Sequence, residues 1–159
     1  MIQFDNQGYI TPAEVIEIDF DIFEKTFTFN EHRQLIFQEY LIFLNELKAL
    51  NIGSFYQWIN GSFTTLKSNP NDIDVVTFVH FEEYKLNEKK LYELKNHFKS
   101  RKIDSYFVAV YPKEHMDYSL FLNYDYDFWH KFTRDFKREI RLKTKIKKGF
   151  VKIEFKNEQ

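Results

Sequence analysis

The spacing of apolar residues predicts alternating helices and strands after an extended beginning. Residues 1–30 are expected to form an extended lead-in, with a turn at 8–12 and a short helical turn at 19–25. Asn30 is a typical helix N-cap, and apolar residues then recur every three or four positions, which predicts an amphipathic helix over 31–50. The apolar positions of this helix are Leu35, Ile36, Tyr40, Phe43, Leu44, Leu47 and Leu50.

Beyond this helix, strands and helices alternate. Residues 72–79 are apolar at both odd and even positions, which is typical of a central strand that is covered on both faces. The order helix–strand–strand–helix–strand–helix–strand predicts an α/β (α+β) fold, with a mixed β-sheet flanked by helices. The predicted strands are 54–60, 72–79, 103–110 and 149–155, and the later helices are 87–100 and 126–138.

Length and composition exclude several classes of protein. The chain has 159 residues and no linker or repeat, so we expect a single domain over 1–159. The absence of cysteine excludes disulfides and cysteine-based metal sites, and the four glycines are too far apart for a P-loop or a G-x-G-x-x-G loop. No apolar run is long enough for a membrane helix and no signal peptide is visible, so we expect no membrane partner and a cytoplasmic location.

The charge is unevenly distributed. The net charge is −1, but residues 131–152 contain ten basic and two acidic residues, which makes this region +8 and the remainder −9. One interpretation is contact with phosphates, including RNA binding with a strong salt dependence. The other is a solvated helix face followed by a strand whose lysines discourage edge pairing. The sequence leaves both interpretations open.

Candidate chemistry is concentrated in residues 58–76. A predicted strand ends in Gly61 and Ser62, a nine-residue loop follows over 63–71, and the next strand opens with Asp72 and Asp74. Alternate residues of a strand share a face, so these two carboxylates are neighbours that repel each other unless a cation lies between them. Such oxygen ligands suit Mg²⁺ or Mn²⁺. Gly61 allows close approach of a ligand, and the N–H groups and hydroxyl of the Gly-Ser pair suit phosphate oxygens.

Asp104 is the candidate for a third carboxylate, because it opens the predicted strand 103–110. If that strand lies beside 72–79, Asp104 joins Asp72 and Asp74 as a catalytic and metal-binding residue of a two-metal phosphoryl-transfer site. Alternatively, it acts as the general base on an acceptor hydroxyl. Lys67 is the preferred candidate for neutralising a phosphate, with Lys148 as the second choice.

These residues resemble the nucleotidyltransferase superfamily with the DNA polymerase β-like palm fold. Its pattern is an apolar residue, Gly and Gly or Ser, a loop, Asp-x-Asp, and an acidic residue on a later strand. Nearly the whole chain also resembles a small bacterial family of uncharacterised nucleotidyltransferase-like proteins. The residues that carry these resemblances are Gly8–Pro12, Phe20, Phe23, Phe27, Arg33, Ile59, Asn60–Phe63, Thr65, Lys67, Pro70, Asp72–Asp74, Asp104, Trp129, Phe132 and Lys148–Val151.

The resemblance implies an enzyme that binds an NTP with Mg²⁺ through Asp72, Asp74, Gly61 and Ser62. It would transfer an NMP group to an acceptor hydroxyl on a protein, a tRNA or a small molecule. Superfamily members of this size also include the antitoxin-like half of toxin–antitoxin pairs, which implies a possible protein partner. The alternative is a non-catalytic regulator that keeps the fold and binds a nucleotide or a partner. Many superfamily members have a basic residue directly after the Gly-Ser pair, whereas the first one here is Lys67.

Overall fold

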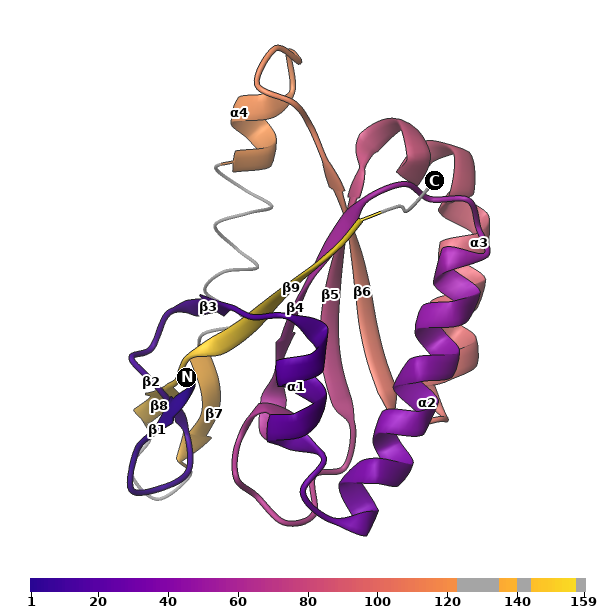
Figure 1. Cartoon of the computed structure of the whole chain (residues 1–159). Helices are drawn as coiled ribbons and strands as arrows, with labels where there is room; N and C mark the ends of the chain where they lie inside the picture. The colour runs from indigo at the N-terminus through magenta and orange to yellow at the C-terminus, as the bar shows by residue number, and fades with distance from the viewer. Residues whose placement is uncertain (123–134, 140–143, 157–159) are drawn as a thin grey trace.

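A computed structural model of the chain contains one five-stranded mixed sheet, in the order β3-β9-β4-β5-β6 (Figure 1). The structure describes residues 1–122, 135–139 and 144–156. Strand β4 is antiparallel to both of its neighbours, whereas β3 is parallel to β9 and β5 is parallel to β6. The strands of this sheet are β3 (Val15–Glu17), β4 (Phe55–Asn60), β5 (Ile73–His80), β6 (Ile103–Val110) and β9 (Phe150–Phe155).

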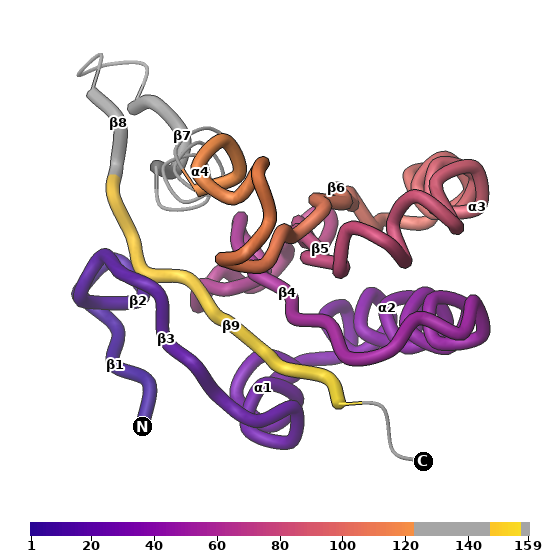
Figure 2. Tube along the Cα trace, turned by 90° about the horizontal axis from the view of Figure 1, so that it is seen from above, coloured from indigo at the N-terminus to yellow at the C-terminus, as the bar shows by residue number. Residues whose placement is uncertain are grey.

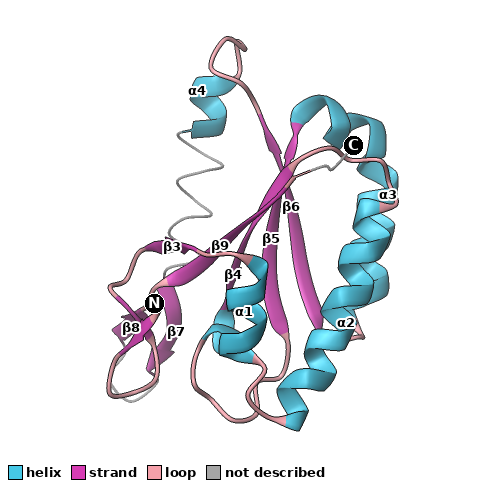
Figure 3. Ribbon diagram, in the orientation of Figure 1, coloured by secondary structure: helices cyan, strands magenta, loops and turns pink. Residues whose placement is uncertain are grey.

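Three helices cover one face of the sheet, and a short fourth helix lies on the opposite side (Figures 2 and 3). Two small antiparallel pairs, β1 with β2 and β7 with β8, lie apart from the main sheet. The helices are α1 (Phe20–Phe27), α2 (Glu31–Lys48), α3 (Phe81–Lys99) and α4 (Tyr118–Leu120). The paired strands are β1 (Gln3–Phe4), β2 (Ile10–Thr11), β7 (Asp135–Glu139) and β8 (Thr144–Lys147).

The predicted mixed α+β fold is confirmed, together with several of its elements. Strand β5 lies between β4 and β6, as its apolar residues on both faces indicated. Helix α2 begins where Asn30 caps it, because the Asn30 side chain accepts a hydrogen bond from the Arg33 N–H at 2.8 Å. Helix α3 begins at Phe81, earlier than predicted, because it follows β5 directly and the His80 ring accepts from the Glu82 N–H.

Two predictions about helices are wrong in part. Most of the helix predicted over 126–138, namely residues 126–134, lies outside the described residues. The remaining residues, 135–138, belong to β7. Their backbone pairs with β8 instead of forming helical hydrogen bonds. In α2, Leu35 is 64% exposed although the apolar spacing placed it inward, whereas Arg33 is fully buried. The predicted buried face of α2 is otherwise confirmed, because Ile36, Tyr40, Phe43, Leu44 and Leu47 are buried.

Aromatic side chains fill the core between the helices and the sheet. Phe23 of α1 packs against Phe37 and Tyr40 of α2, with ring centroids 6.1 and 6.0 Å apart. Phe63, from the segment after β4, is also fully buried and lies 5.9 Å from Phe23. This segment is thus anchored in the core rather than free on the surface. No helix among the described residues is long and apolar enough to cross a membrane.

Candidate functional site

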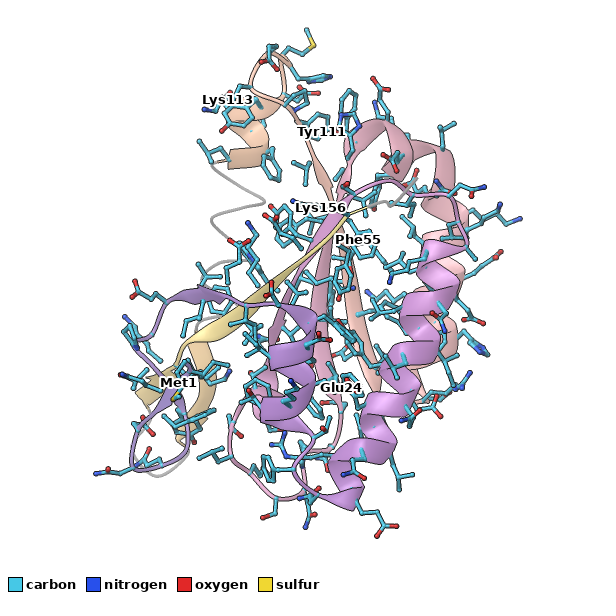
Figure 4. All side chains as sticks on the ribbon, viewed as in Figure 1. Met1, Glu24, Phe55, Tyr111, Lys113 and Lys156 are labelled. Atoms are coloured by element: carbon cyan, nitrogen blue, oxygen red, sulfur yellow. The ribbon has the colours of Figure 1, made fainter. Side chains whose placement is uncertain are left out.

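Three carboxylates meet where β5 and β6 begin. Because the two strands are parallel and in register, Asp74 lies directly beside Asp104, and Asp72 precedes Asp74 by two residues. One ligand oxygen from each of Asp72, Asp74 and Asp104 lies within 4.8 Å of the others. All three side chains are half-buried. The structure therefore brings the three predicted acidic residues together, at the opposite end of β6 from Tyr111, which is labelled in Figure 4.

The carboxylates repel one another strongly in the absence of a cation. Burial raises the pKa of Asp74 from its ordinary 3.8 to about 7, and the charges of Asp72 and Asp104 add to this effect. A hydrogen bond to Asp104 acts in the same direction, whereas the ammonium of Lys148 opposes it. Asp74 thus takes up a proton near neutral pH, and a bound cation would relieve the same repulsion.

Gly61 makes the closest backbone approach to this cluster. It follows Asn60, whose register partner across the β4–β5 pair is Asp74. Its φ is +75°, and a Cβ atom built on it would collide with Oδ2 of Asp74. Only glycine fits here without displacing the carboxylate, for both conformational and steric reasons.

A short 3₁₀ helix, Gly61–Thr64, carries the chain away from β4. Ser62 lies in the first turn of this helix and is half-buried. It directly follows Gly61, which lies against the Asp74 carboxylate. The Thr65 hydroxyl donates to the Ser62 carbonyl at 2.6 Å, and accepts from the Lys67 N–H at 3.1 Å. The Lys67 side chain itself is exposed on the loop. Hydrogen bonds of the loop thus hold the backbone of Lys67, and the phosphate-binding role of its side chain stays a prediction.

Lys148 is the buried cation beside the carboxylates. Its side chain is fully buried, and Nζ donates to the Thr64 hydroxyl at 3.0 Å and to the Gly149 carbonyl at 3.3 Å. Burial lowers its pKa from 10.5 to about 7, although the attraction of Asp74 acts in the opposite direction. Lys148 lies two residues before β9, so the segment that leads into β9 supplies a charged group to a site formed by the middle strands.

Two further residues, which no sequence motif indicated, lie at the site. Thr64 links the 3₁₀ helix to Lys148 through its hydroxyl. Tyr106 lies two residues beyond Asp104 on β6; burial raises its pKa, and the charges of Asp104, Asp74 and Asp72 raise it further. A threonine and a tyrosine carry no motif of their own. The alternation along β6 was the one available signal, because it places Tyr106 on the same face as Asp104.

The donor set fits a hard divalent cation. Three carboxylates offer only oxygen ligands, which Mg²⁺ and Mn²⁺ prefer. Their mutual repulsion raises the pKa of Asp74, so a bound cation would relieve a cost that the folded protein already carries. The residues present are therefore suited to hold such an ion. Most of the basic region at 131–152, with the RNA contact that it suggested, lies outside the residues whose side chains are described.

Comparison with known proteins gives a family. A model described as "Family of unknown function (DUF6932)" matches residues 2–154. The chain belongs to this family. No curated protein and no solved structure matches the chain. The DUF6932 match includes the three carboxylates, the Gly61 turn and Lys148, so the whole candidate site lies within the part of the chain that defines the family.

Proposed function

We propose that the chain is a metal-dependent nucleotidyltransferase, which transfers an NMP group from an NTP to an acceptor hydroxyl. The observation that carries this proposal is the meeting of Asp72, Asp74 and Asp104, with ligand oxygens within 4.8 Å, beside a glycine turn at the end of the neighbouring strand. Carboxylates on adjacent strands next to a backbone turn suit a metal-bound triphosphate, because one part holds the cation and the other approaches the phosphates.

Each residue of the site has a role in this proposal. Asp72 and Asp74 hold the cation, Mg²⁺ or Mn²⁺, which supplies positive charge to the phosphate oxygens when bound. Gly61 and Ser62 bring backbone and hydroxyl groups to the triphosphate. Lys148, held by the Thr64 hydroxyl, supplies positive charge in its protonated form. This assignment replaces Lys67, whose side chain is exposed, with the buried lysine.

The reaction is an in-line displacement at the α-phosphorus. The acceptor oxygen forms a bond to that phosphorus as the bond to the bridging oxygen of the β-phosphate breaks, and pyrophosphate leaves with the electron pair. Asp104 is placed either to hold a second cation or to take the proton of the acceptor hydroxyl. The acceptor is a hydroxyl of a protein, a tRNA or a small molecule, and a protein partner is one way of presenting it.

The first experiment is a thermal-stability screen with each of the four NTPs, with and without Mg²⁺. A ligand at about 100 times its Kd stabilises the folded state by roughly 2.7 kcal/mol, which is easily seen as a rise in Tm. We expect a rise that requires Mg²⁺ and disappears in Asp74→Asn. Asp117→Asn, which changes the acid directly before α4, is the matched control and should keep the rise.

Pyrophosphate release then separates catalysis from binding. Nucleotide-dependent pyrophosphate formation, lost in Asp74→Asn, supports the transferase. Nucleotide binding without pyrophosphate release, across protein, RNA and small-molecule acceptors, favours the regulator that binds nucleotide without turnover. No rise in Tm with any NTP would contradict the proposal and favour a partner-binding role.

A further inference from the structure

Arg33 is a buried charge in an unusual setting. It lies in the first turn of α2 and is fully buried, and burial lowers its pKa from 12.5 to about 10. Among the described residues, its guanidinium makes hydrogen bonds with backbone carbonyls and forms no ion pair with a carboxylate. A buried cation without a counter-ion is costly, so its hydrogen bonds must offset a large loss of hydration.

These hydrogen bonds converge on the loop that follows Gly61. The guanidinium makes six contacts at 2.7–3.4 Å with five carbonyl oxygens, four of them in the loop. The shortest are to Phe63, Thr65 and Lys67, each at 2.7 Å. One arginine thus holds successive parts of the loop from a single point, which its planar fork of donors makes possible.

Aromatic rings complete the enclosure. The guanidinium carbon lies 4.4 Å from the ring centroid of Phe29 and 5.0 Å from that of Phe63. Phe63 is buried in the core, whereas Phe29 is 47% exposed and covers the guanidinium from the outer side. The start of α2 holds the far part of the loop as well, because the Asn30 amide donates to the Ser68 carbonyl at 2.8 Å.

The direction of these bonds determines what the loop presents to a ligand. In a planar trans peptide, the C=O and the following N–H point in opposite directions. The carbonyls of Ser62 and Phe63 face Arg33, so the N–H groups of Phe63 and Thr64 face away from it, where the 3₁₀ helix uses them for its own hydrogen bonds. The N–H groups of Gly61 and Ser62, at the start of this helix, have no acceptor within it and suit an anion, and Arg33 fixes their orientation by holding the carbonyls that follow.

We propose that Arg33 is a positioning residue for nucleotide binding: it fixes loop 62–67 with its carbonyls turned inward, so that the Gly61–Thr64 turn presents N–H groups to the triphosphate. This inference rests on the proposed function and deepens it. Arg33 touches neither the substrate nor the carboxylates in this proposal. Its effect should therefore fall on nucleotide affinity and leave the carboxylate cluster unaffected.

The test compares Arg33→Lys with the wild type. Lysine keeps the charge but replaces the planar fork with a single ammonium, so it cannot reach all of these carbonyls. We expect the Kd for the NTP–Mg²⁺ complex, measured by calorimetry, to rise about tenfold or more, a loss of roughly 1.4 kcal/mol or more of binding. The Kd of the carboxylates for Mn²⁺ alone, measured by electron paramagnetic resonance, should stay the same. General damage to the fold would weaken both.

Arg101→Lys is the matched control. It makes the same exchange at an arginine that pairs with Glu39 at 2.7 Å, away from the loop. We expect no change in nucleotide affinity. Hydrogen exchange in the ligand-free protein gives a second readout, because the amides of residues 63–67 should exchange faster in Arg33→Lys than in the wild type or in the control.

The outcomes separate this inference from the proposed function. If the wild type binds no NTP–Mg²⁺, both fail. If the wild type binds and a folded Arg33→Lys binds equally well, only the positioning role is overturned. If Arg33→Lys does not fold, Phe29→Ala decides, since it opens the guanidinium to water, which competes with the loop carbonyls for its N–H groups. A higher nucleotide Kd with unchanged Mn²⁺ affinity then supports the inference, and an unchanged nucleotide Kd overturns it.

Discussion

The Asp74→Asn substitution should make the metal-free protein more stable at pH 8. The Asp74 carboxylate is half-buried and lies against Asp72 and Asp104. An asparagine amide is uncharged and can donate to Asp104, as the protonated Asp74 does in the wild type. The variant therefore resembles the wild type in its protonated form at every pH. Asp74→Asn removes a charge that the proposed metal site requires, and we expect this to raise the free energy of unfolding.

The size of the effect follows from the pKa. The folded protein holds the Asp74 proton more tightly than the unfolded chain, since the pKa rises from 3.8 to about 7. The free energy of unfolding of the wild type therefore falls as the pH rises from about 4 to about 7. Each tenfold change in proton affinity corresponds to about 1.4 kcal/mol, so the total fall is up to roughly 4 kcal/mol. The free energy of unfolding of Asp74→Asn lacks this pH-dependent fall, but the variant also loses the attraction between Asp74 and Lys148.

Other groups in the cluster titrate in both proteins, so the comparison uses the difference between them. Burial lowers the pKa of Lys148 to about 7, and its contribution to stability therefore rises between pH 7 and 10.5. Asp72, Asp104 and Tyr106 also face the carboxylate of Asp74. The difference in stability between the variant and the wild type should already be about 1–2 kcal/mol at pH 5, grow further up to about pH 7, and level off by pH 8.

The assay is urea unfolding in EDTA at pH 5, 6, 7 and 8, for the wild type, Asp74→Asn and the control Asp117→Asn. Adding Mg²⁺ at pH 8 should then stabilise the wild type and leave Asp74→Asn unchanged, because a ligand of the folded state raises the free energy of unfolding. Parallel curves for the wild type and Asp74→Asn from pH 5 to 8 would refute the reasoning. So would a variant that is less stable than the wild type at pH 8.

Three further substitutions test other contacts. Gly61→Ala should cost at least about 1–2 kcal/mol of stability in urea unfolding, because the φ of Gly61 is +75°. It should also abolish the Mg²⁺-dependent rise in Tm, because the new Cβ displaces the Asp74 carboxylate. Lys148→Met should raise the affinity of the carboxylates for Mn²⁺, because it removes a competing positive charge, and should lower nucleotide affinity about tenfold. A fall in both affinities would contradict the phosphate-binding role of Lys148. Tyr40→Phe should cost about 1–3 kcal/mol in urea unfolding, because it removes the 2.5 Å hydrogen bond to the buried Gln57 side chain.

The parts of the fold that the sequence predicted are those with strong local signals. Strand β6 has the predicted bounds, 103–110, because apolar and β-branched residues dominate it and polar residues flank it. The cap at Asn30 is equally local, since one side chain bonds an N–H three residues away. The convergence of Asp74 and Asp104 needed one further step, namely that strand 103–110 lies beside strand 72–79, and the register of β5 and β6 confirms it.

The parts that the sequence did not predict depend on contacts between distant residues. The sequence ranked Lys67 above Lys148, but the Lys67 side chain is exposed, whereas Lys148 is buried and reaches Thr64 across more than eighty residues. Arg33 has the charge of a surface residue, and only the loop carbonyls around it explain its burial. Residues 135–138 have helical spacing, but their backbone pairs with β8. In each case a tertiary contact outweighs the local pattern.

The position of β9 has a consequence for the order of folding. Strand β4 pairs with β5 on one side and with β9 on the other, and β9 begins ninety residues after β4 ends. During synthesis, β4, β5 and β6 emerge long before β9, so the free edge of β4 stays unpaired until residues 150–155 leave the ribosome. Contacts this distant slow folding, and an open strand edge invites pairing with other chains. Since Lys148 arrives with the same segment, the last strand closes the sheet and completes the charge of the site in a single step.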